Sequence, residues 1–245
     1  DRSAAGPGVY LLSFQAENEV RRVVTYAASK GSRAFSALVP KTPYGDVVTS
    51  AFAGAAREAG VTTLTVQDYD AAPQLAVGPA RLAAQSKPDA LLIGDGAAML
   101  QSLTPALAAG GITNQNTRLL GTGLWADAAV QREPRLQNGW FAAPMPDAFR
   151  NFSDHYRRVF NAQPPRIATL SYDAMALVAL LSPGRPYDRF TNSALTNPSG
   201  FSGIDGIFRF RDDGSADRGL AILEVNQAGF RVVDPPPAAF PMAGF

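Results

Sequence analysis

A small set of residues with side chains suited to ligand binding follows the predicted strands of this chain. The set comprises Tyr44, Asp95, Gly96, Thr122 and Trp125. Tyr44 can offer a hydroxyl, Trp125 can offer an apolar face, and Asp95 carries the only formal charge of the set. These groups predict a wall that binds a partly apolar ligand carrying a hydrogen-bond donor or a cation.

Each of these side chains also has a structural interpretation. Tyr44 can pack its ring at a helix N-terminus, and Trp125 can cover the core beneath its own turn. Asp95 lies between Gly94 and Gly96, where aspartate is ordinary turn chemistry. The sequence leaves the structural and the functional interpretation open for each residue.

Catalytic chemistry finds no support in the residue pattern. The sequence has no G-x-S-x-G elbow, no G-x-G-x-x-G turn that opens a helix, no Walker A loop and no cluster of His, Cys and Asp. His155 is the only histidine, and we expect it at the surface because it lacks an oriented acid–base partner. We therefore predict no catalytic residue, no cofactor and no metal site.

One stretch shows how a strand and a helix can position such a side chain. Residues 33–39 form a mostly apolar run, and apolar residues recur at helical spacing over residues 47–59. Thr42 and Pro43 suit the N-cap and the first position of that helix. The loop between the strand and the helix contains Tyr44, so we expect this tyrosine at the carboxyl end of a strand.

The same order of strand, loop and helix repeats along residues 9–143. We expect strands at 9–14, 33–39, 61–66, 90–93, 117–120 and 140–143, with helices at 20–28, 42–60, 75–86 and 97–109. This alternation predicts an α/β fold with a Rossmann-like, doubly wound parallel sheet and right-handed crossovers. In such a sheet the loops after successive strands gather at one edge, where the candidate residues would share one wall.

The pattern changes at Pro144. We expect helices at 149–160 and 167–181, a hairpin of 206–211 with 219–225, a strand at 230–233 and a proline-rich tail. Residues 9–143 thus form a complete ligand-binding lobe, and residues 144–245 form part of a second α/β lobe with few strands. Because apolar side chains such as Leu177 and Leu181 would then lack cover, we expect a dimer or a companion chain.

Composition narrows the classes of partner. The net charge is +1 and Lys and Arg are scattered, so we exclude nucleic acid. The chain has no cysteine, which excludes disulfides and thiolate sites. It has no apolar run of the ~20 residues that a membrane span needs, and residues 1–3 do not begin a signal peptide.

Three longer motifs resemble one family. They are VPKTPYGDVVTSAF after a strand, the helix SYDAMALVALL and the ending GFSGIDGIFRFRDDGSADRGLAILEV. The chain resembles the type I periplasmic solute-binding proteins, in particular the leucine/isoleucine/valine-binding branch of the ABC transport receptors. This resemblance implies two Rossmann-like lobes joined by three hinge strands, with the ligand between them. Compared with that plan, the chain is expected to begin near the first hinge crossing, without the initial β/α units.

Two tyrosines match positions that contact ligand in this family. Tyr44, in its PYG turn, resembles the tyrosine of the second lobe, and Tyr172 resembles a first-lobe tyrosine that faces the cleft, although it can also be a core tyrosine. Two turns differ: GDGAAM stands where the family has an aromatic residue, and GTGLWAD where it has the acidic residue that receives the ligand's ammonium group. The segment that holds the ligand's carboxylate belongs to the absent units.

The resemblance supports two hypotheses of function. The first is a periplasmic receptor of an ABC importer, which binds an amino acid or a similar small molecule and docks on a permease. The alternative is a lipoprotein-type activator of a class A penicillin-binding protein, which uses the same fold to bind a protein. Loss of ligand-contacting side chains favours the second hypothesis, and the loop positions favour the first.

Overall fold

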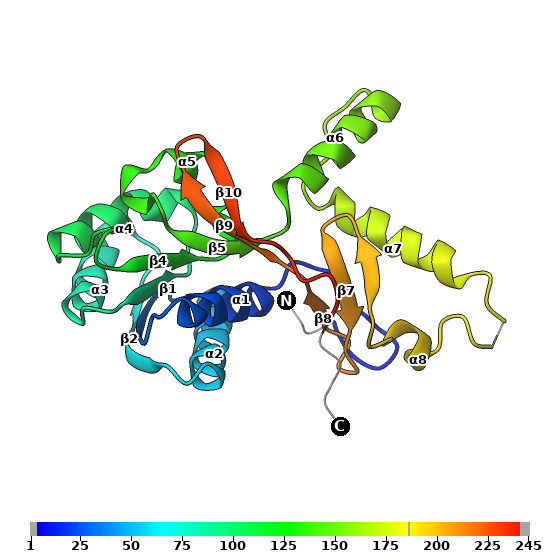
Figure 1. Ribbon diagram of the computed structural model, residues 1–245, viewed down its shortest axis with the longest axis horizontal. Coiled ribbons are helices and arrows are strands. Elements are labelled where there is room, and N and C mark those ends of the chain that lie inside the picture. The colour runs from blue at the N-terminus through cyan, green and yellow to red at the C-terminus, as the bar shows by residue number, and fades with distance from the viewer. Residues whose placement is uncertain (1–3, 186, 241–245) are drawn as a thin grey trace. The chain divides into compact units, whose positions relative to one another are not determined.

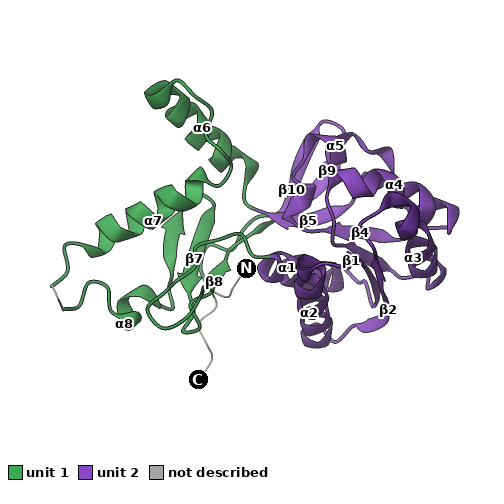
Figure 2. Ribbon diagram, turned by 180° about the vertical axis from the view of Figure 1, so that it is seen from behind, with its two compact units in different colours: residues 1–15, 144–221, 235–245 green, residues 16–143, 222–234 purple. Residues whose placement is uncertain are grey.

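A computed structural model describes residues 4–185 and 187–240. The chain folds into two compact units (Figure 2). Unit 1 takes in residues 1–15, 144–221 and 235–245, and unit 2 takes in residues 16–143 and 222–234. Among the described residues, no helix combines the length and the apolar composition that crossing a bilayer requires.

Unit 2 is built on a seven-stranded sheet in the order β10-β9-β5-β4-β3-β1-β2. The pairs β1–β2, β1–β3, β3–β4 and β4–β5 are parallel, and β9–β10 is antiparallel. The strands are β1 (Ala34–Pro40), β2 (Thr62–Tyr69), β3 (Ala90–Ile93), β4 (Arg118–Gly121), β5 (Trp140–Ala143), β9 (Ala221–Asn226) and β10 (Gly229–Asp234). The predicted α/β fold with a mostly parallel sheet is confirmed.

Helices cover this sheet in two pairs. They are α1 (Ala16–Ser29), α2 (Pro43–Glu58), α3 (Pro73–Gln85) and α4 (Ala97–Ala109), followed by the short η1 (Gly123–Trp125), α5 (Ala128–Arg132) and η2 (Pro134–Leu136). Helix α1 packs against α2 and helix α3 against α4, and the strands lie between the two pairs (Figure 1). Every residue of β3 is buried, as expected for a strand covered on both faces.

Two segments of the chain differ from the structure expected for them. Residues 9–14, expected as a strand, lie outside the named strands, and Leu11 only donates its N–H to the carbonyl of Gly214. The hairpin expected between 206–211 and 219–225 is also wrong. Strand β7 (Gly206–Phe210) pairs with β8 (Ala216–Arg218), whereas β9 lies in the sheet of unit 2 beside β5. A short apolar run fits either sheet, so its pattern does not choose the partner.

Polar contacts join β9 to its neighbours. The buried carboxylate of Glu224 accepts a hydrogen bond from Trp140 Nε1 at 3.1 Å and one from Arg231 Nη2 at 2.7 Å. The Arg118 guanidinium lies over the Trp140 ring at 4.1 Å. Since Trp140 lies on β5 and Arg231 lies on β10, Glu224 connects β9 to both of its neighbours in this sheet.

Unit 1 combines two long helices with a small antiparallel sheet. Its elements are α6 (Pro146–Phe160), α7 (Ala168–Leu181), α8 (Asn192–Leu195) and a three-stranded sheet of β6 (Phe201–Gly203), β7 and β8. Leu177 of α7 is buried with Phe208, Phe210 and Ala216, and Leu181 packs against this cluster. The expectation that Leu177 and Leu181 lack cover is therefore wrong.

A network of charged groups attaches α7 to the turn between β6 and β7. Asp205 is buried and forms a two-pronged ion pair with Arg166, with its Oδ1 at 2.7 Å from Arg166 Nη2. Thr169 donates its hydroxyl to the same carboxylate, and Asp173 accepts the N–H of Ile204 at 2.8 Å. These contacts explain why Asp173 of the SYDAM motif lies inward.

Other apolar side chains of unit 1 are exposed. Helix α6 has no buried residue, and Phe160 is 63% exposed. On α7, Met175 is 66% and Leu180 is 64% exposed. The proline-rich tail forms no helix or strand over residues 235–240, and residues 241–245 lie outside the described part.

Candidate functional site

The carboxyl ends of three neighbouring strands bring the candidate side chains of unit 2 together. Tyr44 follows β1, Asp95 and Gly96 follow β3, and Thr122 follows β4, and these strands are adjacent in the order β4-β3-β1. The Tyr44 hydroxyl lies 2.8 Å from Thr122 Oγ1. This contact joins the loops of the two outer strands, so these side chains share one edge of the sheet.

Tyr44 is held by the start of α2. Thr42 is the N-cap, and its hydroxyl accepts the N–H of Gly45 at 3.2 Å. Burial raises the pKa of Tyr44, and the nearby carboxylates of Glu19 and Asp95 raise it further, against the lowering effect of its bond to Thr122. Tyr44 therefore stays a neutral phenol at physiological pH and can donate or accept a hydrogen bond.

Asp95 is fixed by two hydrogen bonds. Its Oδ2 accepts from the Tyr69 hydroxyl and its Oδ1 accepts from the Gly96 N–H, each at 2.7 Å. Tyr69 ends β2 and is buried, and burial followed by its bond to Asp95 raises the pKa of this phenol. The aspartate thus forms the turn expected of it and also places a carboxylate at this edge.

Trp125 differs from the expectation that it offers an apolar face to a ligand. Its ring is fully buried, and a Cβ added at Gly121 would lie only 2.1 Å from it. The ring centroid is 6.4 Å from that of Phe141. Because the turn folds the indole under the end of β4, the exposed apolar side chain is Leu124, at 47%.

Glu19 is a member of this cluster that the sequence analysis missed. It lies in the first turn of α1, and its Oε2 accepts the N–H of Gly123 at 2.9 Å. Burial raises the pKa of Glu19 to about 7, against the opposing effect of the bond from Gly123, with a smaller rise from the nearby charge of Glu17. An acidic residue in the first turn of a helix is common, so nothing in its spacing marked it.

The cluster therefore combines two carboxylates with hydroxyls and a small apolar surface. Glu19 and Asp95 supply the carboxylates, Tyr44 and Thr122 the hydroxyls, and Leu124 the apolar contact. Gly96 lies beside Leu124, since a Cβ added there would be 3.8 Å from the leucine Cβ. Such an edge is suited to a donor or a cation on a partly apolar molecule.

The remaining sequence candidates lie in unit 1. Tyr172 is on α7, is 54% exposed, and meets the ring of Phe152 edge-on at 5.6 Å. His155, on α6, is exposed as expected. Within residues 4–185 and 187–240, no three His, Cys, Asp or Glu side chains are grouped in a way that could hold a metal ion.

Comparisons with known proteins agree with this architecture. A family model described as Periplasmic binding protein matches residues 1–230. No match is found among curated proteins. The fold is similar to that of a protein from Rhodospirillum rubrum described as a branched-chain amino acid ABC transporter, with a TM-score of 0.75 and 17% identity over 91% of this chain and 67% of that one.

Two further solved structures contain a ligand. A substrate-binding protein of an ABC transporter from Desulfitobacterium hafniense, in complex with Leu, has a TM-score of 0.62 and 19% identity over 89% of this chain and 65% of that chain. A solute-binding protein from Rhodopseudomonas palustris BisB5, in complex with 3,4-dihydroxybenzoic acid, has a TM-score of 0.63 and 16% identity over 94% of this chain and 66% of that one. The chain thus spans about two thirds of the length of these structures.

Proposed function

Since the chain belongs to the periplasmic binding protein family, we propose that it acts as the solute-binding receptor of an ABC importer in the periplasm. The family consists of non-enzymatic receptors. The partners in this proposal are a small molecule and an ABC permease. Its ligand is an amino acid with an apolar side chain, or a similar molecule that pairs a cationic group with an apolar body.

One observation supports this ligand class above all others. The Tyr44 hydroxyl meets Thr122 at 2.8 Å, and both Glu19 and Asp95 lie close enough to raise the pKa of Tyr44. Two carboxylates at one edge favour a ligand that carries an ammonium group, because a charge-assisted hydrogen bond is about twice as strong as a neutral one.

The carboxylates also help to choose between the two ligand types bound by the relatives. Leucine carries an ammonium group in addition to its carboxylate, whereas 3,4-dihydroxybenzoic acid has a carboxylate and no cation. A carboxylate placed beside Asp95 would be repelled. The charges of this edge therefore favour the amino acid over the aromatic acid.

The roles proposed for the single residues follow from their surroundings. Tyr44, Asp95, Gly96 and Thr122 form the wall that contacts the ligand, Leu124 supplies its apolar surface, and the buried Trp125 supports the turn from below. The contact of Tyr172 with ligand stays a prediction. The relatives with a bound small molecule favour transport over activation of a penicillin-binding protein.

A calorimetric panel tests the proposed function. The full-length gene product is titrated with leucine, isoleucine, valine, 3,4-dihydroxybenzoate and benzoate at neutral pH. We expect at least one amino acid to bind with methyl NMR shifts at Leu124, and both aromatic acids to bind at this edge at least about tenfold more weakly. Binding of the aromatic acids alone at this edge would contradict the ligand class. Binding of no small molecule, together with capture of a penicillin-binding protein, would contradict the receptor function.

A further inference from the structure

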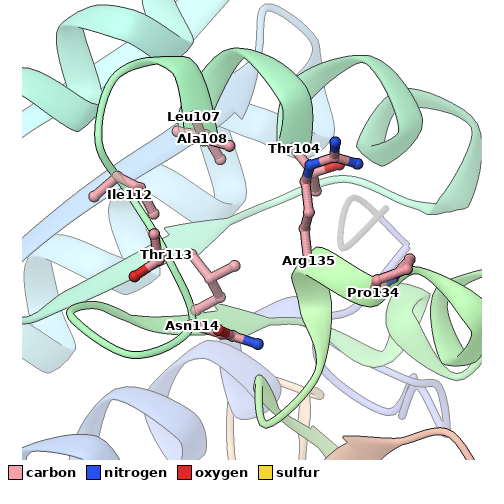
Figure 3. A pocket seen from close by; sticks show the side chains of 9 residues that line it. Thr104, Leu107, Ala108, Ile112, Thr113, Asn114, Pro134 and Arg135 are labelled. Carbon is pink, nitrogen blue, oxygen red and sulfur yellow. The ribbon is translucent and has the colours of Figure 1, made fainter.

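A concave site lies within unit 2, apart from the candidate site described above. It has a volume of about 410 Å³ and is formed by the C-terminal half of α4, residues 112–114, the start of β4 and η2 (Figure 3). Leu107, Ile112 and Leu119 contribute an apolar floor and are each no more than 5% exposed. Ligand pockets of proteins have volumes of roughly 300 to 1,000 Å³, so this site has room for a small organic molecule.

This pocket is distinct from the candidate site at the carboxyl ends of the strands. Leu119 is the second residue of β4, and residues 112–114 precede that strand, whereas Thr122 directly follows it. Because β4 is parallel to β3 and β5, the loops before these strands lie at the amino ends of the strands and the loops after them lie at the opposite, carboxyl ends. A molecule in the pocket would not touch Tyr44 or Asp95.

Thr104 gives the pocket a polar group without a partner. Its side chain lines the pocket and is 2% exposed, and its hydroxyl has no hydrogen-bond partner among the described residues. A threonine inside a helix commonly donates to the carbonyl four residues earlier, which Thr104 does not do. Since buried hydroxyls are nearly always hydrogen-bonded, this one is suited to a polar group of a ligand.

Arg135 adds a cation at the rim. It is the only charged side chain among the described residues that line the pocket. Figure 3 shows it extending from η2 toward Thr104 on α4. Its Nη1 lies 3.4 Å from Glu133 Oε1, and the side chain is 52% exposed. Such an exposed ion pair contributes little, so the guanidinium can bind another anion.

We propose that this pocket binds a small monocarboxylate with an apolar body. The carboxylate accepts hydrogen bonds from the Arg135 guanidinium and the Thr104 hydroxyl, and the hydrocarbon part packs on Leu107, Ile112 and Leu119. A guanidinium presents paired N–H groups that match a carboxylate. The ligand needs no ammonium group here, in contrast to the ligand of the candidate site.

A matched series of probes tests the chemistry. Hexanoate, hexanamide and hexylamine share one hydrocarbon body and differ in the head group, and each is titrated by calorimetry into the full-length gene product. We expect hexanoate to bind, hexanamide to bind at least about tenfold more weakly, and hexylamine to show no binding. No heat with hexanoate, or equal affinity for hexanoate and hexanamide, would overturn the proposal.

Variants test the residues. We expect Arg135→Gln to weaken hexanoate binding by about tenfold and Thr104→Val to weaken it by about threefold, with neither variant unfolding at a lower temperature than the wild type. Arg132→Gln is the matched control, since Arg132 is an exposed arginine of the neighbouring α5 that does not line the pocket. This variant should bind hexanoate with the affinity of the wild type. Equal affinities in Arg135→Gln and the wild type would overturn the assignment.

Methyl NMR locates the bound probe. Saturation with hexanoate should shift the methyl resonances of Leu107, Ile112 and Leu119 and leave those of Leu124 unchanged. Shifts confined to Leu124, with affinity lost in Tyr44→Phe, would place hexanoate at the candidate site and overturn the second site. Because the probe lacks an ammonium group, its failure to bind would leave the amino-acid receptor function standing.

Discussion

Unit 2 and unit 1 are both built from helices on a sheet, but they differ in how much of their apolar surface they cover. In unit 2 the sheet lies between two pairs of helices, and every residue of β3 is buried. In unit 1, α7 covers a three-stranded sheet with Leu177, while its other side exposes Met175 and Leu180. Helix α6 buries no residue at all.

This difference indicates that unit 2 can hold candidate binding residues in place with its own strands and helices. The candidate residues of unit 2 lie on short loops between strands and helices whose other sides are buried, which is the kind of scaffold that holds side chains in place. Helix α7, in contrast, carries large apolar side chains on its exposed side as well as on its buried side, a pattern typical of helices that are covered on both sides. Four predictions, from the largest expected effect to the smallest, test this comparison.

Gly45→Ala should disrupt the first turn of α2. A Cβ at this position would lie 1.8 Å from the carbonyl oxygen of Pro40, which is backbone and cannot move without displacing β1. We expect unit 2 to lose about 3 kcal/mol or more of unfolding free energy, measured by chemical denaturation. Gly54→Ala is the control in the same helix, because its Cβ would meet no atom within 4 Å, and it should be neutral or stabilising.

Glu19→Gln should change how stability depends on pH. In the folded protein the pKa of Glu19 is raised from 4.5 to about 7, so the unfolded chain gives up this proton at lower pH. The favourable contribution of the protonated carboxyl is complete below about pH 4.5 and is lost as the pH rises through about 7.

Glutamine can still accept from Gly123 but does not ionise. Relative to the wild type, the variant should therefore gain stability between about pH 4.5 and pH 7, with an upper limit of about 3 to 4 kcal/mol at about 1.4 kcal/mol per pKa unit. Denaturation curves at several pH values provide the measurement. If the stability of the two proteins changed with pH in the same way, the raised pKa of the buried Glu19 carboxyl would be contradicted.

Leu177→Ala and Leu180→Ala compare the two sides of α7. Leu177 is 7% exposed and Leu180 is 64% exposed, so we expect losses of about 2 kcal/mol for the first and less than about 0.5 kcal/mol for the second. Thermal melts of both variants give the measurement. An equal, large loss for Leu180→Ala would show that a partner covers the second side in solution.

Thr104→Val should stabilise unit 2 slightly. The valine keeps the shape of the side chain and removes a buried hydroxyl that has no partner among the described residues. We expect a gain of about 1 kcal/mol in the absence of hexanoate, read from chemical denaturation. A loss of similar size would mean that the hydroxyl makes a stabilising contact, which would contradict its assignment as a free donor.

Local pattern was sufficient to predict most of unit 2. The apolar run at 90–93 and the helical spacing at 97–109 coincide with β3 and α4, because buried central strands and amphipathic helices have distinct periods. The loops after β1, β3 and β4 were found for the same reason. The sequence did not indicate which sheet β9 joins, because its side-chain contacts there are tertiary. Glu224 of β9 binds Trp140 and Arg231, which lie on different strands.

The site itself was predicted only in part. Tyr44 and Thr122 were chosen by their place after strands, and they meet. The turn that follows β4 folds Trp125 inward and Leu124 outward, and this orientation depends on the backbone of a short 3-10 helix rather than on residue type. Glu19 reaches the same edge from α1 through a tertiary contact with Gly123, which no local pattern reveals.

Titration of leucine into the wild type and Asp95→Asn tests the central claim most directly. The claim is that the carboxylate edge of unit 2 binds a cationic group, so calorimetry of the full-length gene product should show leucine binding that Asp95→Asn weakens by about tenfold. Asp127→Asn is the control, because Asp127 is exposed and asparagine can keep its N-cap bond to Ala129. Unchanged affinity in Asp95→Asn would contradict the account, and so would the absence of binding of leucine, isoleucine and valine to the wild type.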